Sequence, residues 1–187
     1  DCNIKLIKMK VLIIGYGSIG KKHFSIIKKN FKITKIYILS RRKIKINGAI
    51  ILKSKEQIKK IKPHYIILTS ETNKHYSHLK YIEKNLSGTK VLVEKPLFHK
   101  EIKMNIKKNK VYVGYNLRFH PGIIFLKKQL KKKQPIDIKI IVNSYLPNWR
   151  KGNYEHSYSA SKKKGGGVIL DLSHEIDLAL WLFGNIK

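Results

Sequence analysis

Hydrophobic and polar positions follow two alternating patterns over the first 119 residues of the chain. Short apolar runs, typical of buried parallel strands, are followed by segments in which apolar residues recur among lysines at helical spacing. This alternation predicts βαβ units around a parallel sheet. We expect strands at residues 10–14, 33–39, 48–52, 65–69, 90–93 and 110–115, helices at 19–29, 55–62 and 74–85, and a short basic helix before the last strand.

The pattern changes after residue 120. Residues 121–133 predict a basic amphipathic helix, and residues 136–145 alternate as one long strand. Residues 147–164 are polar and aromatic and predict a loop. An apolar helix is expected over residues 168–183, with Gly184 as its C-cap.

These elements divide the chain into three parts. We expect an N-terminal extension over residues 1–8, a doubly wound α/β domain over 9–119 and the start of a second α/β domain over 120–187. One strand and two helices lack the sheet that would bury their apolar faces. The second domain is therefore expected to be incomplete and the chain to be truncated at its C-terminus.

Composition narrows the class of protein. The 187 residues are 42% hydrophobic, no apolar stretch is long enough to cross a bilayer, and the start lacks the features of a signal peptide. A cytoplasmic protein without a membrane partner is expected. Cys2 is the only cysteine, which excludes an internal disulfide and a cysteine-based metal cluster, and we expect no metal site.

The net charge of +30 raises the hypothesis of a nucleic-acid partner. The lysines are dispersed along the whole chain, however, beside isoleucine and asparagine, in stretches such as residues 53–62 and 103–110. Solvated helix faces explain this distribution better than a binding patch does. We therefore expect no specific nucleic-acid partner, although retention on DNA at physiological salt would reverse that interpretation.

The junction after the first strand carries the first chemical signal, Gly15-Tyr16-Gly17-Ser18-Ile19-Gly20. In a G-x-G-x-x-G between strand and helix, Gly15 permits the tight turn, Gly17 lets a pyrophosphate approach the backbone, and Gly20 lets the helix pack closely. Glycines at this spacing also occur in ordinary turns, but the strand and helix on either side favour dinucleotide binding. Free N–H groups of the helix N-terminus, including those of Ser18 and Ile19, would bind the phosphates.

The end of the second strand suggests which dinucleotide is bound. An NAD site usually has Asp or Glu about 20 residues after the glycines, and this chain has neither there. It has Ser40-Arg41-Arg42, and an arginine at this place accommodates a 2′-phosphate. NADP is therefore favoured as the cofactor, and NAD is the alternative.

Five further segments follow in order: residues 20–23, 69–75, 94–96, 116–121 and 165–177, the third being Glu94-Lys95-Pro96 and the last containing G-G-G-x-x-x-D and H-x-x-D. Together with the glycine motif they resemble the Gfo/Idh/MocA family of glucose-fructose oxidoreductase, inositol dehydrogenase and related enzymes. The resemblance implies an N-terminal Rossmann domain and a C-terminal α/β domain on a mostly antiparallel sheet. It also implies hydride transfer between a nicotinamide and a sugar, polyol or nucleotide sugar.

The resemblance makes Lys95 the catalytic lysine. An ammonium group beside the nicotinamide can polarise or protonate a carbonyl oxygen as hydride reaches the carbon. The resemblance also gives catalytic roles to Asp171, which would orient its neighbours, and to His174, which would hold or relay the substrate hydroxyl proton. Many members place one more residue between this Asp and His, so the helical phase of the pair is open.

Other positions are assigned by their place beside these motifs. Thr69, Asn73, His75, Glu94 and Lys95 are expected at the cofactor, and His23 is expected to pack on the glycine turn. The loop over residues 147–164 offers stacking faces and donors suited to a sugar ring. The substrate-binding residues predicted in this way are Lys95, Asn116, Arg118, Trp149, Arg150, Tyr158 and His174, with pairing of Arg118 to an acidic group between the domains as the favoured alternative.

The expected partner is a small sugar-like molecule. A homo-oligomer is expected only if the full protein contains the missing sheet. The competing hypothesis is a non-catalytic NADP-binding protein, or an inactive truncated fragment, because the family uses that sheet as one wall of the substrate site.

Overall fold

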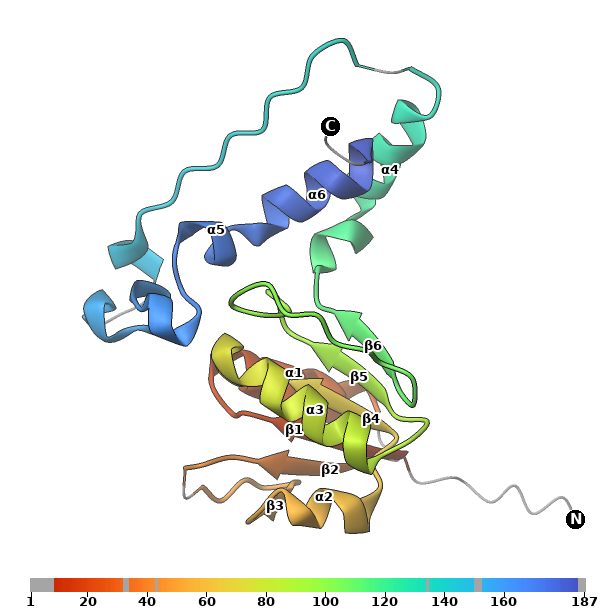
Figure 1. Cartoon of the computed structure of the whole chain (residues 1–187), viewed down its shortest axis with the longest axis vertical. Helices are drawn as coiled ribbons and strands as arrows, with labels where there is room; N and C mark the ends of the chain where they lie inside the picture. The colour runs from red at the N-terminus through yellow and green to blue at the C-terminus, as the bar shows by residue number, and fades with distance from the viewer. Residues whose placement is uncertain (1–8, 32–33, 43, 134, 150–152, 185–187) are drawn as a thin grey trace, which may run out of the picture.

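A six-stranded, fully parallel sheet forms the centre of the computed structural model, which describes residues 9–31, 34–42, 44–133, 135–149 and 153–184 (Figure 1). The strand order is β3-β2-β1-β4-β5-β6, which is the Rossmann order and confirms the expected α/β class. The strands are β1 (Met9–Ile14), β2 (Thr34–Leu39), β3 (Ile50–Leu52), β4 (Tyr65–Leu68), β5 (Lys90–Val93) and β6 (Lys110–Val113).

The strand register brings the residues that follow five of the strands to one edge of the sheet. Ile14 of β1 is aligned with Leu39 of β2 and Leu68 of β4, and Val93 of β5 is aligned with Leu68 and Val113. The next residues along each strand therefore share the carboxyl edge, where open α/β sheets bind ligands. These are Gly15, Ser40, Thr69, Glu94 and Gly114.

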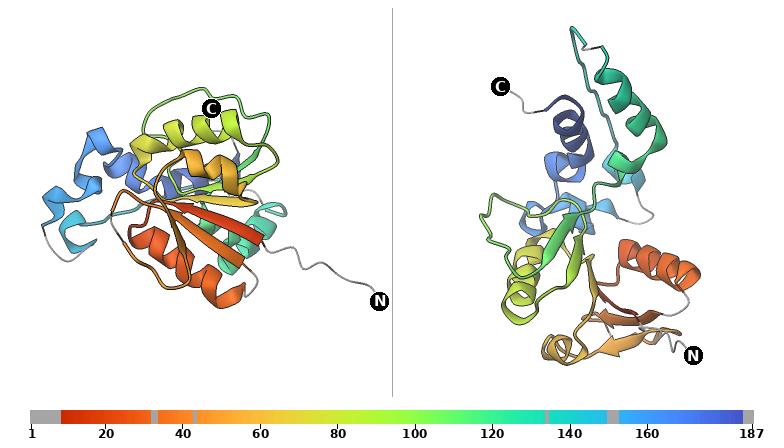
Figure 2. Two further views of the ribbon diagram at one scale, coloured as in Figure 1. Left: turned by 90° about the horizontal axis from the view of Figure 1, so that it is seen from below. Right: turned by 90° about the vertical axis from the view of Figure 1, so that its right-hand side faces the viewer.

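Helices cover both faces of the sheet (Figure 2). On one face α1 (Ser18–Asn30) packs Phe24 and Ile27 against the odd-numbered positions of β1. On the other face α2 (Glu56–Ile61) and α3 (His75–Asn85) pack against the even-numbered positions. Because successive side chains of a strand point to opposite faces, the continuous apolar runs of β1 and β4 fill two cores at once.

The segment between β5 and β6 is not helical, so the expected basic helix there is wrong. Its Leu97, Phe98 and Met104 pack against the core beside α3. The Glu83 carboxylate of α3 accepts hydrogen bonds from the backbone N–H groups of Lys107 and Lys108, at 2.8 and 2.6 Å. These contacts satisfy backbone donors without helical bonds and hold the segment in an extended course.

We call residues 9–119 the first region and residues 120–184 the second region. The second region contains α4 (Pro121–Leu130), α5 (Val168–Asp171) and α6 (Ser173–Phe183). The helix expected over 168–183 is broken at Leu172. Short 3₁₀ turns lie in both regions. The first region contains η1 (Thr72–Lys74) and η2 (Asn116–Phe119), and the second contains η3 (Leu146–Trp149), η4 (Tyr154–His156), η5 (Tyr158–Ala160) and η6 (Lys162–Lys164).

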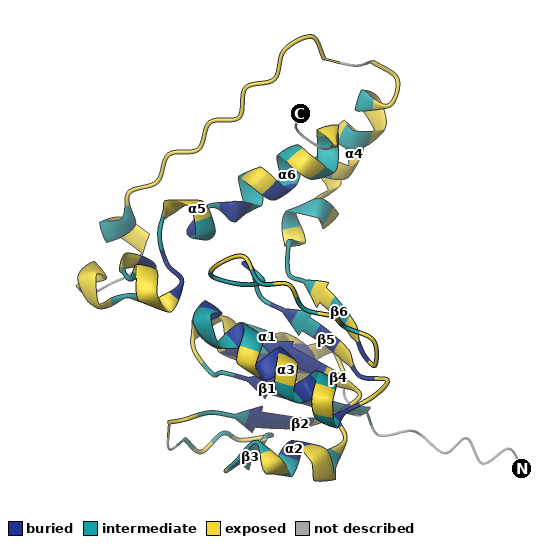
Figure 3. Cartoon of the chain, viewed as in Figure 1, coloured by how far each residue is buried: buried dark blue, intermediate teal, exposed yellow. Residues whose placement is uncertain are grey.

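The strand expected at residues 136–145 is not present. This stretch is extended and largely exposed, and no described strand pairs with it (Figure 3). Alternation of apolar residues predicts a strand only where a neighbouring strand completes its hydrogen bonds and covers its apolar side.

Two features are absent from the residues that the structure describes. No helix in these ranges is long and apolar enough to cross a membrane. No group of three or more His, Cys, Asp or Glu side chains in the same ranges could hold a metal ion.

Candidate active site

The glycine turn after β1 is closely packed at two of its three glycines. Gly15 has φ +96°, and a Cβ there would lie 2.7 Å from the backbone nitrogen of Ser70. A Cβ on Gly20 would lie 2.4 Å from the carbonyl oxygen of Gly15. Thr69 Oγ1 donates to that same oxygen at 2.7 Å. Only glycine fits at these two positions. The close contacts there hold the turn, α1 and the end of β4 together.

Gly17 differs from these two glycines. It is the N-cap of α1, and a Cβ there would meet no described heavy atom within 4 Å. No side chain caps the helix, its first turn contains no acidic residue, and Ser18 and Ile19 are exposed. The free N–H groups of the first turn are therefore available to an anion.

Two buried polar atoms beside the turn also lack a partner among the described residues. They are Ser70 Oγ and Asn73 Oδ1, both in the segment that follows β4. Unpaired buried oxygens are costly unless a ligand or water completes them. Together with the open space at Gly17, they fit a nicotinamide dinucleotide laid across the carboxyl edge of the sheet.

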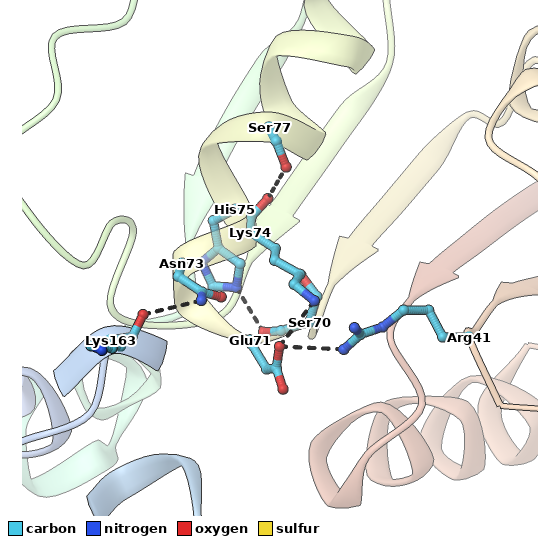
Figure 4. A network of polar contacts seen from close by, with 8 residues as sticks. All are labelled: Arg41, Ser70, Glu71, Asn73, Lys74, His75, Ser77 and Lys163. Carbon is cyan, nitrogen blue, oxygen red and sulfur yellow. Dashed lines mark hydrogen bonds and ion pairs between the residues drawn. The ribbon is translucent and has the colours of Figure 1, made fainter. Parts of the chain in front are cut away.

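An ion-pair network lies where β2 and β4 end (Figure 4). Arg41 Nη2 and Lys74 Nζ lie 3.3 and 3.2 Å from the same oxygen, Oε2 of Glu71. Partial burial alone would raise the pKa of the Glu71 carboxyl, but the hydrogen bond from Lys74 and the charges of Lys74, Arg41 and Lys164 lower it. Beside Arg41, the Arg42 N–H donates to Ser40 Oγ at 3.2 Å.

His75 lies beneath this network rather than at the surface. It is 1% exposed, and its Nε2 lies 3.0 Å from the carbonyl oxygen of Ser70. Its Nδ1 lies 3.2 and 3.1 Å from the carbonyl oxygens of Pro96 and Leu97. Burial lowers the pKa of His75, and the three carbonyls oppose that effect. The imidazole thus ties the end of β4 to the segment that carries Lys95.

Lys95 follows β5 and reaches the second region. Its Nζ donates a hydrogen bond to the backbone carbonyl of Asp171, the last residue of α5. The preceding Glu94 is held from the other side, because His23 Nε2 of α1 lies 2.6 Å from Glu94 Oε1. The Lys95–Pro96 peptide bond is cis. Lys95 therefore stands at the carboxyl edge, between the glycine turn's helix and the start of α6.

The break at Leu172 places Asp171 and His174 in two different helices, so no single helical phase relates their side chains. Asp171 ends one helix, and its carboxylate accepts hydrogen bonds from the Gly167 N–H at 3.1 Å and from Ser159 Oγ at 3.3 Å. His174 begins the next helix, with its ring edge-on to Tyr115 at 5.7 Å between centroids. The two side chains thus have different surroundings, although they are only three residues apart.

His174 has the properties of a proton acceptor. Burial and, next, the positive charge of Lys95 lower its pKa, so the ring is neutral near pH 7. Its Nδ1 is buried and has no partner among the described residues. A neutral imidazole nitrogen without a partner can accept a hydrogen bond.

The remaining predicted substrate residues are spread over both regions. Asn116 is exposed at the start of η2, and Trp149 Nε1 donates to Ser144 Oγ within its own segment. Arg118 donates two hydrogen bonds to the Asp177 carboxylate of α6, one of them from Nε to Oδ2 at 2.8 Å. This is the pairing with an acidic group between the two regions that the sequence favoured. Tyr158 lies in η5, whereas Arg150 lies outside the described residues.

Sequence reasoning missed several residues of this edge. It gave no role to Glu71, Ser70 or Tyr115 and did not pair His23 with Glu94. A usable signal existed for Glu71, since only 11 acidic residues accompany 41 basic ones, and this one lies within three residues of a strand end. The contact of Tyr115 with His174 had no such signal, because it depends on how the two regions meet.

Comparison with known proteins gives a family and a fold. Residues 9–115 match the model of the Gfo/Idh/MocA oxidoreductase family, described as having an NAD-binding Rossmann fold. No curated protein sequence matches the chain.

Solved structures resemble the chain over nearly its whole length. The WlbA (WbpB) dehydrogenase of Thermus thermophilus, in complex with NAD and UDP-GlcNAcA, aligns with a TM-score of 0.70 at 20% identity over 95% of this chain and 64% of that one. The scyllo-inositol dehydrogenase of Lactobacillus casei, with NAD(H) and scyllo-inositol bound, aligns with a TM-score of 0.70 at 17% identity over 95% and 56%. A candidate NADPH-dependent oxidoreductase of Desulfitobacterium hafniense gives 0.74 at 20% identity over 94% and 55%. The chain thus spans between 55% and 64% of the length of these three structures, and the likeness is one of fold.

Proposed function

The chain belongs to the Gfo/Idh/MocA family of oxidoreductases, and from this premise we propose that it carries the cofactor site and the catalytic lysine of a nicotinamide-dependent dehydrogenase or reductase. The substrate is a sugar, polyol or nucleotide sugar. One observation carries the proposal: Lys95 lies at the same sheet edge as the Gly15–Gly20 turn and bonds to the backbone where α5 and α6 meet.

The residues at this edge divide the chemistry between them. A bound nicotinamide supplies or accepts the hydride. In the reducing direction Lys95 donates a hydrogen bond, and then a proton, to the carbonyl oxygen that gains negative charge. In the oxidising direction the hydroxyl proton returns along the same path to Lys95, and the neutral His174 holds or relays it. Asp171 holds the Gly167 end of the preceding loop, and its carbonyl keeps the Lys95 ammonium in place.

The proposed cofactor is NADP. Its pyrophosphate would lie on the N–H groups at Gly17, Ser18 and Ile19, and its 2′-phosphate would take the guanidinium groups of Arg41 and Arg42. Arg41 supports this assignment because its side chain is 78% exposed and follows β2, where the ribose is bound in this fold. NAD is the alternative, and the two solved dehydrogenases of known ligand bind NAD or NAD(H).

The proposed substrate site lies between Lys95 and the segment of residues 146–164. Asn116, Trp149, Arg150 and Tyr158 are its candidate contacts, whereas the donors of Arg118 are engaged by Asp177. The solved relatives hold UDP-GlcNAcA and scyllo-inositol, which supports a polyhydroxylated substrate. A cytoplasmic location belongs to the same proposal, and so does a homo-oligomer if the full protein contains the missing sheet.

A steady-state screen tests this function. NADP and NAD are each offered with sugars, polyols and UDP-sugars, and Lys95→Ala is expected to lower kcat by about 10²–10⁴-fold while dinucleotide affinity changes little. Lys100→Ala, an exposed lysine five residues away, serves as the matched control. Turnover that survives Lys95→Ala would refute the role of Lys95. Dinucleotide binding without turnover would favour the competing hypothesis of a non-catalytic binding protein.

A further inference from the structure

We infer that Glu71 is a specificity-determining residue of the dinucleotide site: its carboxylate holds Arg41 and competes with a 2′-phosphate for the guanidinium, so it limits the preference of the site for NADP. The inference rests on the proposed binding of NAD(P) at this edge. It assigns a role to a residue that neither the glycine motif nor the end of β2 contains.

The sheet topology brings the two side chains together from strands that are not neighbours. Arg41 follows β2 and Glu71 follows β4, and β1 with its glycine turn lies between those strands. The ion pair of 3.3 Å therefore joins the segments that follow β2 and β4 at the edge of the sheet where β1 also ends (Figure 4). A ligand at that turn meets the Glu71 carboxylate beside the guanidinium that would bind its 2′-phosphate.

Glu71 is anchored independently of Arg41. Lys74, three residues later in η1, lies 3.2 Å from Oε2 of Glu71, and the side chains of both residues are 34% exposed. The Arg41 side chain, at 78%, is free to turn toward a ligand. A 2′-phosphate can thus draw Arg41 away, but the carboxylate stays where Lys74 holds it.

The energetic consequence differs between the two dinucleotides. A 2′-phosphate must break the Arg41–Glu71 pair and then bear the repulsion of a carboxylate a few ångströms away. A ribose with a free 2′-hydroxyl meets neither penalty. It finds instead an acceptor carboxylate close to the end of β2, where this sequence lacks the usual Asp or Glu. Glu71 thus opposes Arg41 in the choice of cofactor.

The test compares Kd values for NADPH and NADH, measured by fluorescence titration at low salt. Glu71→Gln is expected to tighten NADPH binding about three- to tenfold, because it removes a partly exposed ion pair that competes for Arg41 and a like-charge repulsion of the 2′-phosphate. The same substitution should change NADH binding less than about twofold. In an Arg41→Ala background the same substitution should give a clearly smaller gain in NADPH binding, because the competition is gone and only the repulsion by the carboxylate remains to be relieved. Glu101→Gln, an exposed acid with the same change of charge, is the matched control.

Several outcomes would overturn the inference. They are equal NADPH affinity of wild type and Glu71→Gln, an equal gain from Glu101→Gln, and a gain that is just as large in the Arg41→Ala background as in the wild type. Glu71→Ala, checked for folding by its Tm, replaces Glu71→Gln if the amide variant does not fold. A wild-type protein that binds neither dinucleotide would refute the proposed function and the inference together. If the wild type binds the dinucleotide and turns over substrate but Glu71→Gln leaves the Kd for NADPH unchanged, only the inference is refuted.

Discussion

The two regions use similar apolar residues in opposite ways. In the first region the core runs from Val11 to Val93 and contains every described hydrophobic side chain that is buried. In the second region isoleucines such as Ile138, Ile140 and Ile141 are 44–66% exposed. The difference lies in the surroundings of the backbone, because the six paired strands form a sheet whose two faces are covered by helices, whereas the segment of residues 135–145 has no described strand beside it. Apolar content alone therefore does not make a core.

The regions are joined mainly by polar contacts at the candidate site. Lys95 bonds to the Asp171 carbonyl, Asn73 Nδ2 donates to the Lys163 carbonyl at 3.2 Å, and Arg118 pairs with Asp177. Each contact has one partner in the well-packed first region and one in the exposed second region. The geometry of the site thus depends on a few directional bonds more than on shared apolar packing, and the following predictions separate these contributions.

The largest contrast is expected from truncating a matched isoleucine in each region. Ile13 of β1 is 0% exposed and Ile140 is 47% exposed. Ile13→Ala should lower the free energy of unfolding by about 2–5 kcal/mol, through lost burial and the cavity that remains. Ile140→Ala should change it by less than about 0.5 kcal/mol. Urea denaturation followed by circular dichroism measures both, and similar losses would contradict the contrast.

A second contrast concerns pH. Burial, then the positive charges around it, lowers the pKa of His78 in α3 from 6.5 to about 4. Between these values the unfolded chain binds the proton and the folded chain does not, so stability falls as the pH falls. The contribution of His78, fully present above pH 6.5, should decrease by about 3 kcal/mol on approaching pH 4.

Urea titrations at pH 7 and pH 4.5 test this expectation with one variant in each region. His78→Leu should remove most of the loss between the two pH values. His156→Gln, at an exposed position of η4, should leave it unchanged. If the wild type and His78→Leu lose stability in parallel, His78 is not the group responsible.

Gly20 and Gly17 separate stability from binding within the first region. A Cβ at Gly20 would meet the Gly15 carbonyl oxygen at 2.4 Å, so Gly20→Ala should cost about 1–3 kcal/mol of unfolding free energy. A Cβ at Gly17 would enter open space, so Gly17→Ala should keep the stability and weaken dinucleotide binding. Thermal shifts with and without NADPH measure both quantities. A stable Gly20→Ala, or a Gly17→Ala that binds normally, would contradict this division.

Sequence patterns predicted the first region well because its structure is local and periodic. The apolar runs of β1 and β4 and the glycines between β1 and α1 determine both the strand and the turn. The places of Thr69 and Lys95 after strand ends were predicted for the same reason, and their roles in the site stay predictions. The β5–β6 segment was mispredicted because Glu83, from α3, supplies the acceptors that a helix would have supplied.

The second region was harder to predict because its structure depends on contacts between segments far apart in the sequence. The alternation at residues 136–145 is a local signal for a strand whose partner is not among the described residues. The break at Leu172 directly follows Asp171, whose carboxylate accepts hydrogen bonds from Gly167 and Ser159. The periodicity of apolar residues along the sequence does not predict such bonds. The ion pair of Arg41 with Glu71 was not predicted for the same reason.

The smallest expected effect concerns the fork between Arg118 and Asp177. Asp177 is 8% exposed and Arg118 39%, so removal of the guanidinium leaves a buried carboxylate that water can partly reach. Arg118→Met should therefore cost about 1 kcal/mol, less than for a fully buried pair. Since the core of the first region is elsewhere, the loss should appear as faster amide hydrogen exchange in α6, with α3 unchanged. Arg42→Met, at an exposed position, is the control, and equal acceleration in α3 and α6 would mean that the two regions unfold as one unit.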